Sequence, residues 1–144
     1  MAVQRENPYA NFNFIVAVDG LDEAGFAEVE LPAAEIETIE YREGSDRSSG
    51  ARKLPGRVRY GNLVFRRGVS GRLDLWQWFE AVRGGQADRR NVTVTLLDET
   101  RTPVQQWRFR EAWPVKYDPS DLNGRGNEVV IELLELAVES FDVD

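Results

Sequence analysis

Alternating apolar and polar residues run through most of the chain and predict a protein built mainly from β-strands. In residues 12–18 every second position is Phe or Val, the two-residue period of a strand that buries one face. The Asp19-Gly20 pair that follows predicts a turn. The same kind of alternation predicts further strands in residues 26–31, 36–42, 59–66, 92–96 and 104–111.

One segment, residues 73–83, has the period of an amphipathic helix instead. Its apolar stripe consists of Leu75, Trp76, Phe79 and Val82. Asp74 lies near the positive end of the helix dipole, and Gly84-Gly85 marks the end of the helix. The sequence therefore predicts one helix packed on a sheet.

Residues 127–139 fit two interpretations. Glu128, Glu132, Glu135 and Glu139 have helical spacing, whereas the run from Val129 to Ile131 favours a strand. Periodicity leaves both open. Across the chain, about seven or eight strand signals stand against one firm helix, which predicts a mainly antiparallel barrel or sandwich.

A polar stretch rich in glycine and serine separates the third and fourth predicted strands. It shows no apolar period between Arg42 and Pro55, so we expect an extended exposed loop at about 43–55. A loop of this length in a compact domain usually has a function or is mobile. The full length of 144 residues suits a single domain, residues 1–144.

The amino-acid composition argues against several classes of function. The chain has no cysteine and no histidine, which removes thiolate chemistry and the commonest general base and transition-metal ligand. The formal net charge of −7 argues against a dedicated nucleic-acid site. Residues 1–8 lack the apolar core of a signal peptide, and no membrane segment is expected, so we expect synthesis in the cytoplasm.

Carboxylate pairs are the catalytic groups that this composition can supply. The nominal pairs are Glu132 with Glu135 and Glu35 with Glu37. An acidic chain contains many such pairs by chance, so a solvated surface is the preferred interpretation. We therefore expect no enzymatic activity, no cofactor and no metal.

The four tryptophans suit a core or an interface better than a sugar-binding platform. Trp76 and Trp107 are expected in the core. Trp78 lies off the main helical stripe, so it is either a second core contact or an anchor for a neighbouring subunit. Trp113 and Tyr117 are the other candidates for contacts between subunits.

Charges are ordered along the first half of the chain. Acidic residues dominate from Asp19 to Glu40 and basic residues from Arg47 to Arg72. One interpretation is cross-strand pairing within a subunit, with the strand near Glu37 antiparallel to that near Arg66. The other is that opposite faces of the subunit carry opposite charge, which favours head-to-tail stacking. The two can coexist, with the first slightly preferred.

Several motifs, in this order, resemble the phage tail tube protein family, and most of all the inner tube proteins of extracellular contractile injection systems. They are NPYANFNFIVAVDG (7–20), GFAEVELP (25–32), LPGRVRYGNLVFRRG (54–68), LWQWF (75–79), AWPVKY (112–117) and NEVVIELLELAVE (127–139). The resemblance covers nearly the whole chain. The ordered set, and no single motif, carries it.

The resemblance implies two packed antiparallel β-sheets with one flanking helix, six copies of which close a ring whose inner sheets form one continuous barrel around a lumen. It also implies that residues 127–139 form a strand and that the polar run reaches the adjacent ring. The residues expected in this inter-ring loop are Glu43, Gly44, Ser45, Asp46, Arg47, Ser48, Ser49, Gly50, Arg52 and Lys53.

The partners implied are other copies of the chain, a sheath protein, baseplate, spike and tube-terminator proteins, and a cargo effector in the lumen. Charged residues that can line a polar lumen are Glu37, Arg66, Arg108 and Arg110, although an ordinary solvated face explains them equally well. The alternatives are the tail tube of a true contractile-tailed phage, the ring-forming tube protein of type VI secretion, a monomeric β-barrel that binds a small ligand, and a carbohydrate-active enzyme.

Overall fold

The computed structural model describes residues 2–21 and 25–144. In this part of the chain it contains nine β-strands and one ten-residue α-helix. The elements are β1 (Phe14–Val18), β2 (Glu28–Glu30), β3 (Ala34–Tyr41), β4 (Arg52–Tyr60), β5 (Leu63–Gly68), α1 (Asp74–Arg83), β6 (Arg90–Leu97), β7 (Pro103–Pro119), β8 (Ile131–Ala137) and β9 (Ser140–Val143). No helix among the described residues is long and apolar enough to cross a membrane.

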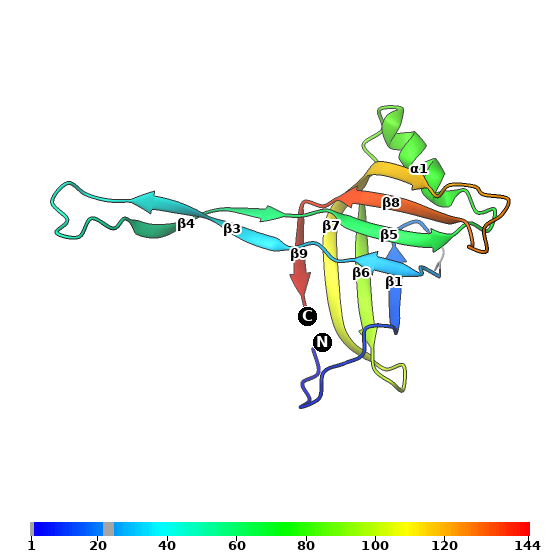
Figure 1. Cartoon of the computed structure of the whole chain (residues 1–144), viewed down its shortest axis with the longest axis horizontal. Helices are drawn as coiled ribbons and strands as arrows, with labels where there is room; N and C mark the ends of the chain where they lie inside the picture. The colour runs from blue at the N-terminus through cyan, green and yellow to red at the C-terminus, as the bar shows by residue number, and fades with distance from the viewer. Residues whose placement is uncertain (1, 22–24) are drawn as a thin grey trace.

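Seven of the strands form one antiparallel sheet that is folded over on itself. Its order is β1-β6-β7-β8-β5-β2, and β9 pairs with β7 as well. The long strand β7 runs through both halves and changes direction near Glu111, whose φ of 54° is left-handed. We call β1, β6, β9 and the start of β7 the first half-sheet, and the end of β7 with β8, β5 and β2 the second. Figure 1 shows the strands of the two halves running crosswise.

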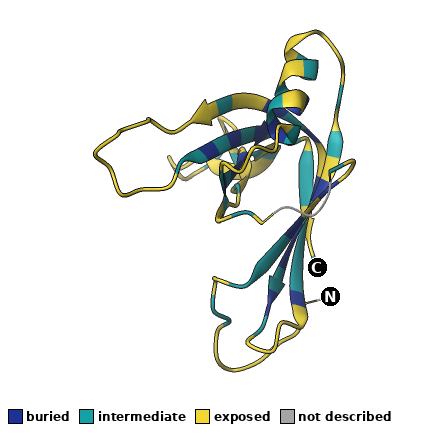
Figure 2. Cartoon of the chain, turned by 90° about the vertical axis from the view of Figure 1, so that its right-hand side faces the viewer, coloured by how far each residue is buried: buried dark blue, intermediate teal, exposed yellow. Residues whose placement is uncertain are grey.

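The core lies between the two half-sheets and is closed by α1. The first half-sheet contributes Val16, Val18, Val92, Val94 and Phe109, the second contributes Leu63, Phe65, Leu134 and Leu136, and α1 contributes Leu75 and Trp78. Buried residues therefore concentrate where the halves meet, and exposed residues dominate the loops (Figure 2). β8 alternates strictly between buried and half-buried positions, as a strand with one face on a core does.

The remaining two strands, β3 and β4, form a hairpin that we call the arm (residues 34–60). Its ladder continues from the β2–β5 ladder, with Ala34 opposite Tyr60, and it projects far beyond the body (Figure 1). Seven of the eight residues of β3 and seven of the nine of β4 are exposed. The arm is thus a two-stranded sheet with no layer of the described chain on either face.

The structure confirms the predicted fold class, the strands around 12–18, 26–31, 36–42 and 92–96, and the helix at 73–83, and it shows a strand from Ile131 in the ambiguous 127–139 segment. The single strand predicted at 59–66 is wrong, because the alternation there spans the end of β4 and the start of β5. The strand predicted at 104–111 continues to Pro119 through the bend at Glu111.

Candidate assembly surfaces

The arm exposes large apolar side chains and also contains many charged residues. Its large exposed apolar side chains are Ile36, Ile39, Tyr41, Leu54 and Val58, between 44% and 62% exposed. Strand β3 contains three Glu and no basic residue, whereas β4 contains three Arg, one Lys and no acidic residue. A lone two-stranded hairpin is marginally stable in water. The arm therefore has the composition of a surface that a partner covers.

Ion pairs join the acidic and basic strands within the chain. Glu37 pairs with Arg59 on the arm, and Arg66 Nη1 lies 3.3 Å from Glu28 Oε1 and 3.4 Å from Glu30 Oε1 in the body. The cross-strand interpretation of the charge order is therefore confirmed. The expected partners were wrong, because β3 pairs with β4 and the strand of Arg66 pairs with β2.

The tip of the arm has its own internal order. The Arg42 guanidinium donates to the carbonyl oxygens of Ser48 and Asp46 at 2.9 and 3.0 Å. Arg52 Nη2 donates to Asp46 Oδ1 at 3.2 Å. The predicted inter-ring residues 43–50 lie in this tip, whereas Arg52 and Lys53 already belong to β4. The polar stretch predicted at about 43–55 is thus the exposed loop at the end of a hairpin, and only its last four residues belong to a strand.

The first half-sheet presents a polar face on the side away from the core. Arg108 pairs with Asp144, and Arg110 pairs with Asp142, along the β7–β9 ladder. Neighbouring positions on the same face are Thr93, opposite Arg108, and Thr95, opposite Gln106. The two arginines are exposed and each is matched by a carboxylate, so the part of this face along β7 and β9 is hydrophilic with balanced charge.

The structure separates the four residues proposed for a lumen. Arg108 and Arg110 share the polar face of the first half-sheet. Glu37 lies on the arm and Arg66 on the outer side of the second half-sheet. Of the four, only Arg108 and Arg110 are thus brought together, because strand alternation places residues two apart on one face.

A buried ionic cluster links three strands to α1. Arg67 Nη2 donates to Glu132 Oε1 at 2.7 Å and to Asp74 Oδ1 at 2.6 Å, and the Tyr117 hydroxyl donates to Glu132 Oε2 at 2.7 Å. Burial first, and then the bond to Glu132, raises the pKa of Tyr117 to about 12. Burial acts to raise the pKa of Asp74, but the bond and charge of Arg67 outweigh it and lower that pKa.

This cluster and the core change the assignment of the aromatic residues proposed for subunit contacts. Trp78 is only 1% exposed and its Nε1 donates to the Asp88 carbonyl at 2.8 Å, so it is a core residue and not a surface anchor. Trp76 and Trp107, expected in the core, are only half-buried. Trp113 and Tyr117 are half-buried too, and Tyr117 contacts Trp76 edge-on. Helical period alone misplaced the buried stripe, because Trp78 points to the segment before β6, where it is bonded to Asp88, whereas Trp76 lies against Tyr117.

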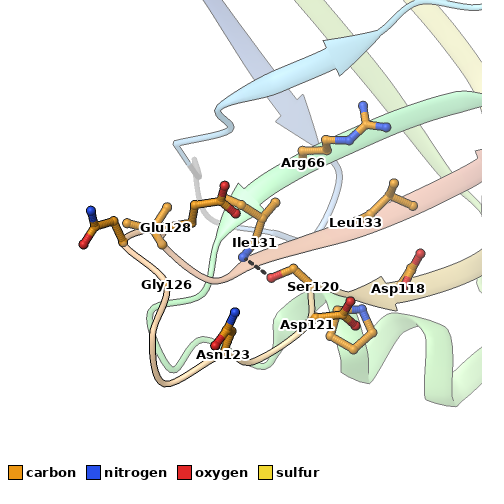
Figure 3. Close-up of a pocket in the computed structure, with 12 residues that line it drawn as sticks. Arg66, Asp118, Ser120, Asp121, Asn123, Gly126, Glu128, Ile131 and Leu133 are labelled. Atoms are coloured by element: carbon orange, nitrogen blue, oxygen red, sulfur yellow. Dashed lines mark hydrogen bonds between the residues drawn. The ribbon is translucent and has the colours of Figure 1, made fainter.

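A polar hollow of about 770 Å³ lies on the outer side of the second half-sheet (Figure 3). Arg66 and Leu133 form its floor, and the segment from Asp118 to Val129 supplies mostly exposed lining residues. The Ser120 hydroxyl accepts a hydrogen bond from the Ile131 amide at 2.9 Å and so ties the loop to β8. The hollow is a feature of the surface, because the core between the half-sheets is filled by side chains.

The nominal carboxylate pairs do not form acid–base sites. Glu132 lies on the core side of β8, whereas its neighbour Glu135 lies on the outer side and accepts from Asn62 Nδ2 at 2.8 Å. Glu35 and Glu37 lie on the arm, and Glu37 is paired with Arg59. Sequence reasoning missed the exposed isoleucines of the arm, whose one available signal was their placement between charged residues.

Sequence and structure comparisons agree with this geometry. The profile of the family described as "T4-like virus tail tube protein gp19" matches residues 10–142. Among curated proteins, none matches the chain by sequence. A chain in the cryo-EM structure of the anti-feeding prophage baseplate is 27% identical, with a TM-score of 0.85 and 97% of each chain covered.

Two further solved structures show the same fold. A chain of the sheath–tube complex of an extracellular contractile injection system, PVC, in its extended state is 23% identical, with a TM-score of 0.86 over 96% of this chain and 93% of that one. Hcp1 from Flavobacterium johnsoniae is 16% identical, with a TM-score of 0.60 over 92% of this chain and 94% of that one.

Proposed function

Because the chain belongs to the family of T4-like virus tail tube proteins, we propose that it is the repeating subunit of the inner tube of a contractile, phage-tail-like injection particle. Stacked rings of the subunit form a hollow conduit. Contraction of an outer sheath drives this conduit through a target envelope, and cargo travels in the lumen. The PVC relative is a chain of a sheath–tube complex, which supports this role.

The arm is the observation that carries the proposal. A ladder of seven register pairs projects from the body, and Ile36 and Val58 stay 62% and 52% exposed in the single chain. Each fully buried side chain of this size contributes roughly 1.5–3 kcal/mol. Contact with other copies therefore stabilises the arm, and a projecting contact on one side of a subunit favours head-to-tail assembly.

Six copies form each ring in this proposal, and their sheets join into one barrel around the lumen. Such closure covers strand edges that a lone sheet leaves open. The polar face with Arg108 and Arg110 suits the lumen, because each of these cations is matched by Asp144 or Asp142 and a hydrophilic face with balanced charge does not retain cargo. Residues 43–53 contact the adjacent ring.

The subunit acts mechanically and performs no reaction. Its buried carboxylate, Glu132, is held by Arg67 and Tyr117 and serves the fold. The partners are other copies of the chain, the sheath, the baseplate with its spike, the tube terminator and a lumenal effector. The anti-feeding prophage baseplate relative supports the baseplate contact.

Negative-stain electron microscopy over a range of concentrations, with light scattering for mass, tests this function. Rings or tubes with a central hole are expected. A persistent monomer, both alone and with baseplate proteins added, is the result that overturns the proposal. It favours the monomeric ligand-binding barrel, which the filled core between the half-sheets already disfavours.

A further inference from the structure

The exposed loop between β7 and β8 contains the single Asn-Gly pair of the sequence, Asn123-Gly124. Asn123 lines the polar hollow on its loop side, and its side chain is exposed there (Figure 3). An asparagine side chain can react with the backbone nitrogen of the next residue, and glycine leaves that nitrogen unshielded because it has no side chain. The surroundings of Asn123 decide whether this reaction is favoured.

Asn123 begins a tight turn that holds its side-chain amide against the backbone that follows. The Gly126 amide donates to the Asn123 carbonyl oxygen at 3.0 Å, which closes a four-residue turn. The Arg125 amide donates to Asn123 Oδ1, also at 3.0 Å. The ring closed by this second bond contains both Cγ of Asn123 and the nitrogen of Gly124, so it limits how far these two atoms can separate.

The bond from Arg125 also activates the side-chain carbonyl. When a nitrogen attacks Cγ, negative charge develops on Oδ1, and a donor about 2.7–3.1 Å from that oxygen stabilises the charge. The Arg125 amide lies at 3.0 Å, within this range. The attacking nitrogen is available as well, since the Gly124 amide donates to no acceptor among the described residues. The turn therefore supplies a nucleophile, an electrophile and a donor for the developing charge.

We propose that Asn123 is a site of spontaneous deamidation. The Gly124 nitrogen attacks Cγ of Asn123, a bond forms between these two atoms, and the Cγ–Nδ2 bond breaks. The proton of the Gly124 amide leaves with Nδ2 as ammonia, transferred through solvent. Water then opens the resulting succinimide, at Cγ to give aspartate or at the backbone carbonyl carbon to give isoaspartate. Water is the one other reactant, and the inference does not depend on the proposed tube function.

Deamidation adds a carboxylate to a hollow that already has an acidic excess. The lining contains the carboxylates of Asp118, Asp121 and Glu128 and one cation, Arg66. The formal net charge of −7 becomes more negative by one. Isoaspartate also lengthens the backbone by a methylene, which removes the turn that begins at Asn123. The reaction thus changes both the charge and the shape of this surface.

The loop can change in this way while the strands beside it stay in place. Two hydrogen bonds between Ser120 and Ile131, at 2.7 and 2.9 Å, tie the ends of the loop together. Every residue of 121–129 between these ends is exposed. The turn at Asn123 is therefore separated from the core, and the reaction can proceed in the folded chain.

Peptide mass spectrometry of the purified chain, aged in mildly alkaline buffer and compared with an unaged sample, tests the proposal. Conversion is read from the mass gained when the side-chain NH₂ becomes OH, and isoaspartate is counted by labelling with protein isoaspartate methyltransferase. Trypsin cuts after Arg125, so Asn123 and Asn127 are read on separate peptides. Asn127 is the matched control, because it is exposed in the same loop but is followed by Glu128.

Conversion at least tenfold faster at Asn123 than at Asn127 is the expected result. Gly124→Ala should slow the conversion of Asn123 at least tenfold, because the added methyl crowds the attacking nitrogen. This substitution suits the backbone, since Gly124 does not have a left-handed φ and a Cβ there meets nothing within 4 Å. Equal rates at the two asparagines, or undiminished conversion in Gly124→Ala, overturn the proposal.

A synthetic peptide of residues 117–130, aged in parallel, tests the role of the turn. We expect Asn123 to react in the folded chain at least as fast as in the peptide, because the Arg125 amide is held at Oδ1 in the folded chain. A rate at least tenfold lower in the folded chain would show that the turn protects Asn123, and this result also overturns the proposal.

Discussion

Arg67 and Glu132 face each other across β5 and β8, with Nη2 and Oε1 2.7 Å apart and each side chain only 4% exposed. The same guanidinium reaches Asp74 on α1. Opposite charges buried this deeply are compensated only by each other and by their hydrogen bonds. The cluster therefore fixes the helix and the second half-sheet relative to each other.

Removing one member of this pair is expected to destabilise the subunit strongly. Arg67→Met leaves the Glu132 carboxylate buried with only Tyr117 as a partner, and the expected loss is about 3–5 kcal/mol in the free energy of unfolding, measured with urea. Glu80→Gln, at an exposed pair with Arg83, is the control and is expected to change stability by about 0.5 kcal/mol or less. Equal effects of the two substitutions would contradict a structural role for the cluster.

The raised pKa of Tyr117 predicts a stability change in alkali. An unfolded tyrosine titrates near pH 10, whereas in the folded chain burial and the bond to Glu132 raise the pKa of Tyr117 to about 12. This contribution to stability is thus complete below about pH 10 and is lost as the pH rises towards 12. The late step in tyrosinate absorbance should disappear in Tyr117→Phe and persist in Tyr41→Phe, which removes an exposed hydroxyl. If Tyr117→Phe instead removed a step in tyrosinate absorbance near pH 10, the raised pKa of Tyr117 would be refuted.

The N-terminal segment, which Arg5 ties to Glu99, should respond to acid. Hydrogen bonds from Arg5, followed by backbone hydrogen bonding, lower the pKa of Glu99 to about 2. Because the folded pKa is depressed, the contribution of this pair to holding residues 3–9 is present above the ordinary glutamate pKa, near 4.3, and is lost as the pH falls towards 2. Carboxyl titration by NMR should show the pKa of Glu99 rising towards 4.3 in Arg5→Gln. Arg83→Gln is the control. An ordinary pKa of Glu99 in the unmodified chain would show that Arg5 does not hold this carboxylate.

Replacing the two tryptophans of α1 should change the free energy of unfolding by very different amounts. Trp78 is 1% exposed and bonded to Asp88, so Trp78→Ala is expected to lower the free energy of unfolding by about 3–5 kcal/mol. Trp76 is half-buried against Phe79 and Tyr117, and Trp76→Ala should lower it by about 1 kcal/mol. Chemical unfolding of both variants tests the order. A larger loss of stability in Trp76→Ala than in Trp78→Ala would instead support the buried helical stripe that periodicity predicts.

Shortening the arm should separate assembly from folding. Ile36 and Val58 are register partners, so residues 37–57 can be replaced by an Asn-Gly turn. The lost side chains are mostly exposed, and we expect a melting temperature within about 4 °C of the full chain but no long tubes. A companion variant, Ile36→Thr with Val58→Thr, keeps the arm and removes its apolar pair. Undiminished tube length in both would show that the arm is dispensable.

Local patterns in the sequence determined most of the secondary structure. The alternation at 12–18 and 92–96 and the helical period at 73–83 predicted β1, β6 and α1, because side-chain direction follows from backbone geometry alone. Composition likewise indicated that residues 43–50 are exposed. The ordered motifs indicated the family, which the match over residues 10–142 confirmed.

The tertiary structure decided which apolar residues are covered. Periodicity treats Ile36 and Phe65 alike, because each is an apolar position in a strand, yet Phe65 is 0% exposed and Ile36 is 62% exposed. The strand of Phe65 turns one face to the core between the half-sheets, and the strand of Ile36 projects beyond the core (Figure 1). Full burial of Trp78 and only partial burial of Trp76 depend in the same way on what each meets, Asp88 before β6 for Trp78 and Tyr117 of β7 for Trp76. Burial is set by contacts between segments distant in the chain, and these contacts arise only when the sheet folds over at Glu111.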